Sequence, residues 1–192
     1  MRPKLLDRVE KHGFAVFESG LYNLNIIGVR TKGRPNEFDD RLCLVYKDND
    51  GWVTREWPAT TDPGTYWLEN PSKIQGTAVL ASPQQCRGVY KIDLHGGRYE
   101  ALCQRLGKVY TWRDSDKSDV VDWNQLDDAV AGWYGINIHR AGKDSTQVDK
   151  WSAGCQVFQQ AKHFDAFMEL VKKSAELYGN AFTYTLIEEE TP

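Results

Sequence analysis

A histidine and a cysteine that could act as an acid–base pair lie sixteen positions apart, at His139 and Cys155. A thiol with its usual pKa of about 8.5 is mostly protonated at neutral pH, so it needs a base to become a nucleophile. An imidazole within hydrogen-bonding distance takes that proton and later returns it to the leaving group. The chemistry open to such a pair is covalent acyl transfer.

The sequence around the pair predicts how the two side chains are brought together. Apolar and polar residues alternate up to His139, which predicts a strand that ends there. Residues 140–150 are polar and contain Gly142, which predicts a loop. The small residues Ala153 and Gly154 then precede Cys155, so backbone N–H groups could approach a substrate carbonyl and hold its oxyanion.

A structural interpretation competes with this one, because free cysteines are among the most buried residues and often fill a core. A single histidine at a strand end can likewise be an ordinary hydrogen-bonded structural group. Spacing alone leaves both interpretations of His139 and Cys155 open.

The segment resembles the active-site signature of the L,D-transpeptidase (YkuD-type) catalytic domain. In that family Ile-His ends a strand, and Ser-His-Gly-Cys follows after a loop. Here Ile138-His139 and Ser152-Ala153-Gly154-Cys155 match, with Ala153 in place of the second histidine. The segment PATTDPGTY at residues 58–66 is similar to the family's substrate-side strand, and the resemblance covers roughly residues 22–160. The wording WSAGCQVF is similar to a phage and prophage subgroup.

The resemblance implies that Cys155 is the nucleophile and His139 its base. It implies that the main-chain carbonyl of Arg140 orients the imidazole and that the backbone at Gly154 holds the oxyanion. It implies no metal and no cofactor. The substrate contacts that follow from position are Asn137, Ser152, Ala153, Trp151, Gln156, Thr60, Thr61 and Tyr134. The family's arginine after the cysteine is missing, and Arg140, Lys143 or Lys150 would have to replace it.

The implied substrate is a stem peptide of peptidoglycan, whose acyl-enzyme can react with water or with an amine. We favour hydrolysis. The protein would then be an L,D-carboxypeptidase or endopeptidase that serves in phage lysis or in wall penetration. The reasons are the phage-like wording, the departures at Ala153 and Gln156, and the lack of an N-terminal signal peptide. The alternatives are an L,D-transpeptidase proper, a non-catalytic virion protein that keeps the fold, and a toxin-like effector. A papain-type protease fits worse, because its cysteine precedes its histidine.

Composition limits the partners and the compartment. The chain has 24 basic and 27 acidic residues and no basic block, so a nucleic-acid partner is not expected. No apolar run approaches the ~20 residues of a membrane span. Cys43, Cys86 and Cys103 form no CxxC motif and predict reduced thiols. We expect synthesis in the cytoplasm, then action on the cell wall after release or from within a virion, with other phage virion or lysis proteins as possible partners.

The expected fold is mainly β (β-rich α+β), in one domain over residues 1–192. It would be an L,D-transpeptidase-like β-sandwich or sheet with a short N-terminal helix and one C-terminal helix. Helical spacing of apolar residues supports helices at residues 4–12 and 161–178. Strands are predicted at residues 24–29, 41–47, 52–57, 76–80, 88–94, 108–113 and 181–187. Residues 99–102 fit a strand or a short helical turn.

Several local predictions go with this fold. Gly28 would mark a β-bulge, Asp48 to Gly51 a hairpin turn, and residues 32–36 a polar turn. His95 is expected in a solvated turn, and the acidic residues 114–128 in a solvated loop. The acidic tail at residues 188–190 is expected to fray.

Overall fold

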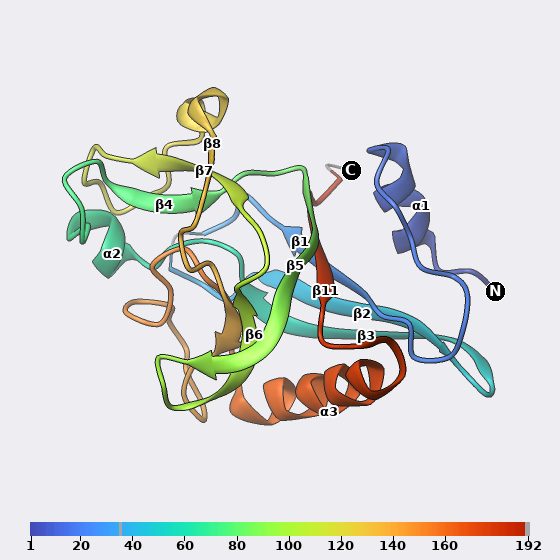
Figure 1. Ribbon diagram of the computed structural model, residues 1–192. Helices are drawn as coiled ribbons and strands as arrows, with labels where there is room; N and C mark the ends of the chain where they lie inside the picture. Colours follow the sequence, from blue (N-terminus) through green and yellow to red (C-terminus); the bar gives the residue numbers. More distant parts are fainter. Residues whose placement is uncertain (35, 191–192) are drawn as a thin grey trace.

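Eight strands form a closed barrel around the core (Figure 1). The computed structural model describes residues 1–34 and 36–190, with the backbone alone for residues 125–127. The barrel strands are β1 (Asn25–Arg30), β2 (Asp40–Asp48), β3 (Gly51–Thr60), β5 (Gln84–His95), β6 (Tyr99–Gln104), β9 (Ile138–Arg140), β10 (Gln156–Phe158) and β11 (Phe182–Glu188). Their order around the barrel is β1-β11-β5-β6-β9-β10-β3-β2.

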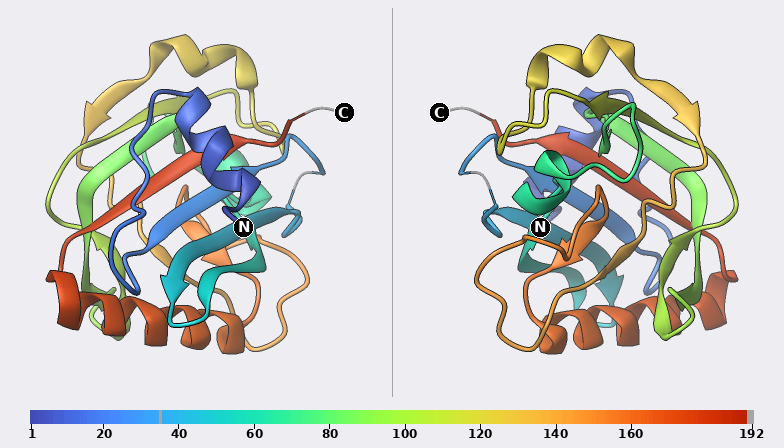
Figure 2. Two further views of the ribbon diagram at one scale, coloured as in Figure 1. Left: turned by 90° about the vertical axis from the view of Figure 1, so that its right-hand side faces the viewer. Right: turned by 90° about the vertical axis from the view of Figure 1, so that its left-hand side faces the viewer.

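A smaller sheet of three strands lies beside the barrel. Its order is β4 (Thr77–Leu80), β7 (Val109–Asp114) and β8 (Val130–Gly132). A 3-10 helix, η1 (Trp123–Asp128), joins β7 to β8 at the end of the molecule opposite α3 (Ala161–Tyr178) (Figure 2). The mainly β class is therefore confirmed. The architecture is a closed barrel and not a two-layer sandwich, because β1 pairs with both β2 and β11 and leaves no free edge.

Three α-helices flank the strands. The predicted N-terminal and C-terminal helices are confirmed as α1 (Lys4–Lys11) and α3, while the short α2 (Thr65–Glu69) was not predicted. In the described part of the chain, no helix has the length and apolarity that crossing a membrane requires.

One face of α3 closes the end of the barrel and completes its core. Phe164 and Phe167 are buried and pack against Phe158 of β10, with ring centroids 5.7 and 4.9 Å away. Trp57 of β3 meets Phe167 edge-on at 6.2 Å. These aromatic contacts anchor β10, and therefore the residues just before it, against the helix.

The predicted strands and the hairpin are confirmed, with small differences at their ends. Asp48 pairs with Gly51 across a two-residue turn, and residues 99–102 belong to a strand, β6. The bulge at Gly28 is wrong: pairing runs through it without a shift, and its missing side chain makes room for the Tyr184 hydroxyl. Pro35, in the predicted polar turn, lies outside the described residues.

Two predictions about acidic residues need correction. The segment 114–128 is not a plain solvated loop, because Asp114 is buried at the end of β7 and residues 123–128 form η1. Within the described chain the tail is tied down, since Glu188 pairs with Lys32 at 3.2 Å and Glu189 with Arg8 at 3.4 Å. Such exposed ion pairs contribute little stability each, but together they order the chain end beside α1.

Candidate active site

Cys155 and His139 lie where the strands of the barrel are shortest. The parallel strands β9 and β10 have three residues each, and β9 touches β6 through the single pair Ile138–Leu102. His139 pairs with Val157, two residues beyond Cys155. Side chains two positions apart on an extended chain point the same way, so this register places Cys155 on the face of the sheet that carries His139.

Cys155 differs from the other cysteines by being accessible. All four cysteines are free, and Cys155 alone is partly exposed while the other three are buried. Its Sγ accepts a hydrogen bond from the backbone N–H of Asn137 at 3.4 Å. The thiol donates to the carbonyl oxygen of Gly135 at 3.5 Å. Cys155 is thus the most accessible of the four cysteines, although burial still governs the pKa of its thiol.

The imidazole of His139 is buried and held at one nitrogen. Nδ1 lies 3.0 Å from the carbonyl oxygen of Arg140, and the Tyr99 hydroxyl lies 3.5 Å from the same nitrogen. A carbonyl oxygen can only accept, so Nδ1 carries the hydrogen and Nε2 keeps the basic lone pair. The main-chain contact expected at Arg140 is therefore present. Among the hydrogen bonds of the described residues, none joins Sγ of Cys155 to this ring.

Both groups are neutral at rest. Burial, the neighbouring His95 and the charge of Arg140 lower the pKa of His139 to about 3, against the hydrogen bond to Arg140, which raises it. Burial raises the pKa of the Cys155 thiol to about 11, and the Asn137 N–H lowers it only partly. A thiolate–imidazolium pair does not form in this resting state. The thiol would have to lose its proton as it attacks a bound carbonyl.

The turn before Cys155 is built by Ser152. Its hydroxyl donates to the carbonyl of Cys155 at 2.7 Å and accepts from the N–H of Gly154 at 3.2 Å. Ser152 is fully buried, so its predicted substrate contact is replaced by a role in the turn. The N–H of Gly154 is likewise occupied. In the described chain the N–H of Cys155 has no acceptor, and it is the donor left for an oxyanion.

Four of the predicted substrate contacts are buried structural residues. Gln156 accepts from the Tyr184 hydroxyl at 2.7 Å and donates to the carbonyl of Thr61 at 3.2 Å. Thr61 donates in turn to Asp40 at 2.7 Å. Asn137 is held by His95 and by Gln104, and Thr60 by the backbone of Asp62. All four side chains are buried, and their hydrogen bonds hold the strands around Cys155 and His139 together.

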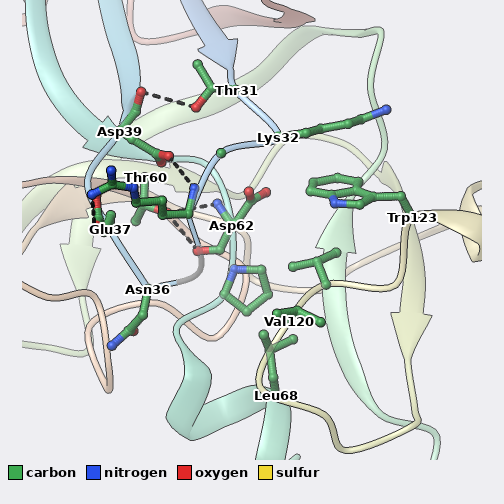
Figure 3. A pocket seen from close by; sticks show the side chains of 14 residues that line it. Thr31, Lys32, Asn36, Glu37, Asp39, Thr60, Asp62, Leu68, Val120 and Trp123 are labelled. Atoms are coloured by element: carbon green, nitrogen blue, oxygen red, sulfur yellow. Dashed lines mark hydrogen bonds and ion pairs between the residues drawn. The ribbon is translucent and has the colours of Figure 1, made fainter.

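Thr60 and Asp62 face a different cavity (Figure 3). This cavity of about 350 Å³ also borders Lys32, Leu68 and Trp123, and neither Cys155 nor His139 lines it. Burial raises the pKa of Asp62 to about 7, although Arg30 at 2.9 Å lowers it. The segment at residues 58–66 therefore supports the site through the hydrogen bond between Thr61 and Gln156, and it lines a separate cavity.

A cavity of about 170 Å³ adjoins the turn at Ala153. Ala153 and Tyr134 line it, as predicted substrate contacts would. Its other walls are Trp67, Ser72, Lys73, Thr77, Ala78, Arg113 and Trp133. Lys73 and Arg113 bring two positive charges, and no acidic side chain lines the cavity. This lining suits an anionic group, although Cys155 and His139 do not themselves line the cavity.

Sequence reasoning missed Lys73 and Arg113. Arg113 lies in β7 and Lys73 just before β4, and pairing of these two strands brings distant segments to one cavity. Arg113 is pre-positioned by a 3.0 Å hydrogen bond to the Gly76 carbonyl and by its place over the Tyr134 ring, 5.2 Å from the centroid. None of the three cations proposed from the sequence lines this cavity: Arg140 stacks on Tyr99, Lys150 stacks on Tyr66, and Lys143 is exposed.

The prediction for Trp151 agrees with its exposure, whereas the prediction for His95 is wrong. Trp151 keeps 44% of its surface exposed beside the turn, so it is available to a ligand. His95 is not in a solvated turn as expected. It ends β5, and its half-buried ring stacks on His139 with centroids 4.0 Å apart. No local sequence signal marks it, because the β5–β6 hairpin folds it onto a strand 44 residues later.

Among the side chains that the structure describes, no group of three or more from His, Cys, Asp and Glu is placed to hold a metal ion. Comparison of the chain with protein-family models, with curated proteins and with solved structures finds no match.

Proposed function

We propose that this protein is a cysteine-nucleophile acyl-transfer enzyme of L,D-transpeptidase type that acts on peptidoglycan stem peptides, mainly by hydrolysis. The observation that carries the proposal is the partly exposed Cys155 directly before β10, the strand that runs parallel to the β9 strand of His139. The Nδ1–H of His139 is held by the Arg140 carbonyl. This arrangement agrees with the role that the sequence resemblance gives each residue.

The proposed reaction has two steps. Sγ of Cys155 attacks the peptide carbonyl carbon while Nε2 of His139 takes the thiol proton, and the N–H of Cys155 holds the oxyanion. The tetrahedral adduct collapses when His139 gives the proton to the leaving amine, which leaves a thioester. Water then attacks the thioester with His139 as base, and the products are a carboxylic acid and the free thiol.

The charged cavity supports a substrate with a free carboxylate. Stem peptides carry carboxylates, and Lys73 and Arg113 could bind one in the cavity that Ala153 lines, two residues before Cys155. A terminal carboxylate held there would favour cleavage near the end of the stem, as in an L,D-carboxypeptidase. An amine acceptor in place of water would make the same intermediate a transpeptidase.

Mass spectrometry of purified peptidoglycan after incubation with the protein tests the proposal. Wild type should release shortened stems or single amino acids, whereas Cys155→Ala should not. Cys103→Ala is the matched control, because this cysteine is buried. Cross-linked or amino-acid-exchanged products would mean transfer instead of hydrolysis. Unchanged muropeptides from several hosts, with both proteins folded, would reject catalysis on this substrate.

One observation favours a second candidate, a non-catalytic virion protein that keeps the fold. In the resting site the thiol donates to the Gly135 carbonyl and both members of the pair are neutral. A purely structural role predicts that Cys155→Ala leaves particle assembly intact and that wild type never forms a thioester. The same peptidoglycan experiment therefore separates the two candidates.

A further inference from the structure

His95 contacts the catalytic histidine face to face. The two rings are 4.0 Å apart at their centroids and inclined by 19°, which is a stacked geometry. Tyr99 borders both rings, 5.6 Å from His95 at the centroids and 3.5 Å from Nδ1 of His139 at its hydroxyl. The face of His139 is therefore covered by a second imidazole, delivered by a different pair of strands.

Asn137 fixes the orientation of His95. The backbone N–H of Gln104 donates to Oδ1 of Asn137 at 3.0 Å, which leaves Nδ2 as the donor to Nδ1 of His95, also at 3.0 Å. His95 therefore carries its hydrogen on Nε2 when neutral. The backbone N–H of the same Asn137 contacts Sγ of Cys155 at 3.4 Å. One residue thus links His95 to the nucleophile, while the ring stack links it to the base.

We propose that His95 is a positioning residue of the Cys155–His139 pair, which holds the His139 ring through stacking and holds Asn137 through Nδ1. The inference rests on the proposed acyl-transfer function. It assigns His95 no direct contact with substrate. Its effect is to keep Nε2 of His139 directed as a base and the Asn137 N–H directed at the thiol.

Charge gives the stack a second consequence. The groups facing His139 are His95 from β5, Tyr99 from β6 and Arg140 from β9. Cys155 acts on Tyr99, and Arg98 and Arg105 act on His95. Two stacked imidazoles this close resist carrying two positive charges. Protonation of His95 at acid pH therefore makes His139 a weaker base, and the acid limb of the rate profile reports His95. Burial and the two arginines lower the pKa of His95 below its usual 6.5, which places that limb below pH 6.5.

The test combines two substitutions with a control. His95→Ala removes both the ring that stacks on His139 and the acceptor for Asn137. It should lower kcat about tenfold with KM little changed, because a misdirected His139 loses part of its contribution as general base. His95→Phe keeps an aromatic ring but cannot be protonated, so more activity should remain and the acid limb should move to lower pH. His12→Phe, an exposed histidine of α1's end, is the control. Equal kcat and an unmoved acid limb in both His95 variants would overturn the proposal.

A readout without substrate separates this inference from the proposed function. NMR of the ring nitrogens should show His139 with its hydrogen on Nδ1 in wild type and in His95→Phe. In His95→Ala it should show mixed tautomers and a pKa nearer the usual value. Unchanged His139 signals in a folded His95→Ala would reject the positioning role. If these signals change as expected while wild type leaves peptidoglycan uncut, the substrate assignment fails and the role of His95 stands.

Discussion

At the scale of single residues, the resting state of Cys155 determines how it reacts. Burial keeps its thiol protonated, with a pKa of about 11, and the lowered pKa of His139 removes the imidazolium that would stabilise a thiolate. Catalysis then depends on proton transfer during attack, and not on a preformed ion pair.

We therefore predict that the alkylation rate of Cys155 by iodoacetamide rises about tenfold per pH unit between pH 7 and 10, because only the thiolate reacts. Mass spectrometry of the labelled protein measures it, and Cys155→Ser identifies the background from the three buried cysteines. A rate that is already maximal at pH 7 would show a stable thiolate and contradict this account.

A second residue-scale prediction concerns the charged cavity. Replacing Arg113 by Gln should raise KM for stem peptides about tenfold with little effect on kcat, because a charge-assisted hydrogen bond to the substrate is lost. Lys73→Gln should act in the same direction, and less, because its side chain is more exposed. Arg87→Gln, an exposed arginine away from the cavity, is the control. An unchanged KM in both cavity variants would exclude the proposed carboxylate contact.

Some of the site was predictable from the sequence and some was not. Cys155, His139 and the Arg140 carbonyl share one local motif, so their neighbourhood could be inferred from a short segment. His95 and Arg113 arrive through long-range strand pairing, which local patterns do not encode. Ser152 and Gln156 have the right positions for ligand contacts, but their polar groups are already hydrogen-bonded, to the backbone and, for Gln156, also to the Tyr184 hydroxyl.

At the scale of elements, the turn from Ser152 to Cys155 depends on Gly154. Its φ is +114°, and a Cβ there would collide with the carbonyl oxygen of Ala78 in β4. Gly51, in the β2–β3 hairpin, has the same φ of +114° but nothing within 4 Å of its Cβ position. Substituting Gly51 therefore tests backbone strain alone, whereas substituting Gly154 tests strain together with a steric collision.

Gly51→Ala should cost about 1–2 kcal/mol of unfolding free energy, which is the strain of the left-handed region. Gly154→Ala should cost at least about 1 kcal/mol more and also lower activity, because the turn must shift away from β4. Urea denaturation of both variants measures the difference. Equal losses would mean that the turn does not pack against β4 as described.

Elements with a strong periodicity were the easiest to predict. The α3 bounds follow from apolar residues at helical spacing and from Gly179 after its last turn. The closure of the barrel was not predictable, since it depends on parallel pairing of β1 with β11 across most of the chain. The five-residue α2 is too short to show a period.

At the scale of the whole molecule, titration of His139 links the site to stability. The folded state holds it neutral, with a pKa of about 3 against the usual 6.5 in an unfolded chain. The unfolded state therefore takes up the proton first as pH falls. The stability that neutral His139 contributes is present above pH 6.5 and is lost as pH falls towards about 3.

Asp62 opposes this trend. Its pKa is raised to about 7, so protonated Asp62 stabilises the folded state, and that stability is lost as pH rises through 7.

The prediction for His139 therefore compares the unfolding free energies of wild type and His139→Phe, since both proteins contain Asp62. Between pH 6.5 and 4, the unfolding free energy of wild type should fall relative to that of His139→Phe by up to about 1.4 kcal/mol per pH unit. Urea titrations at several pH values measure it, and parallel curves would contradict a buried neutral His139.

The central claim is that Cys155 carries an acyl group, and intact-protein mass spectrometry tests it most directly. Wild type is incubated with a purified stem tetrapeptide and quenched in acid, beside Cys155→Ser and Cys103→Ala. We predict an adduct of the acyl fragment's mass in wild type and in Cys103→Ala, mapped to Cys155 by peptide digestion, and no thioester in Cys155→Ser. Absence of any adduct in wild type, across peptides with and without a free carboxylate, would contradict the account.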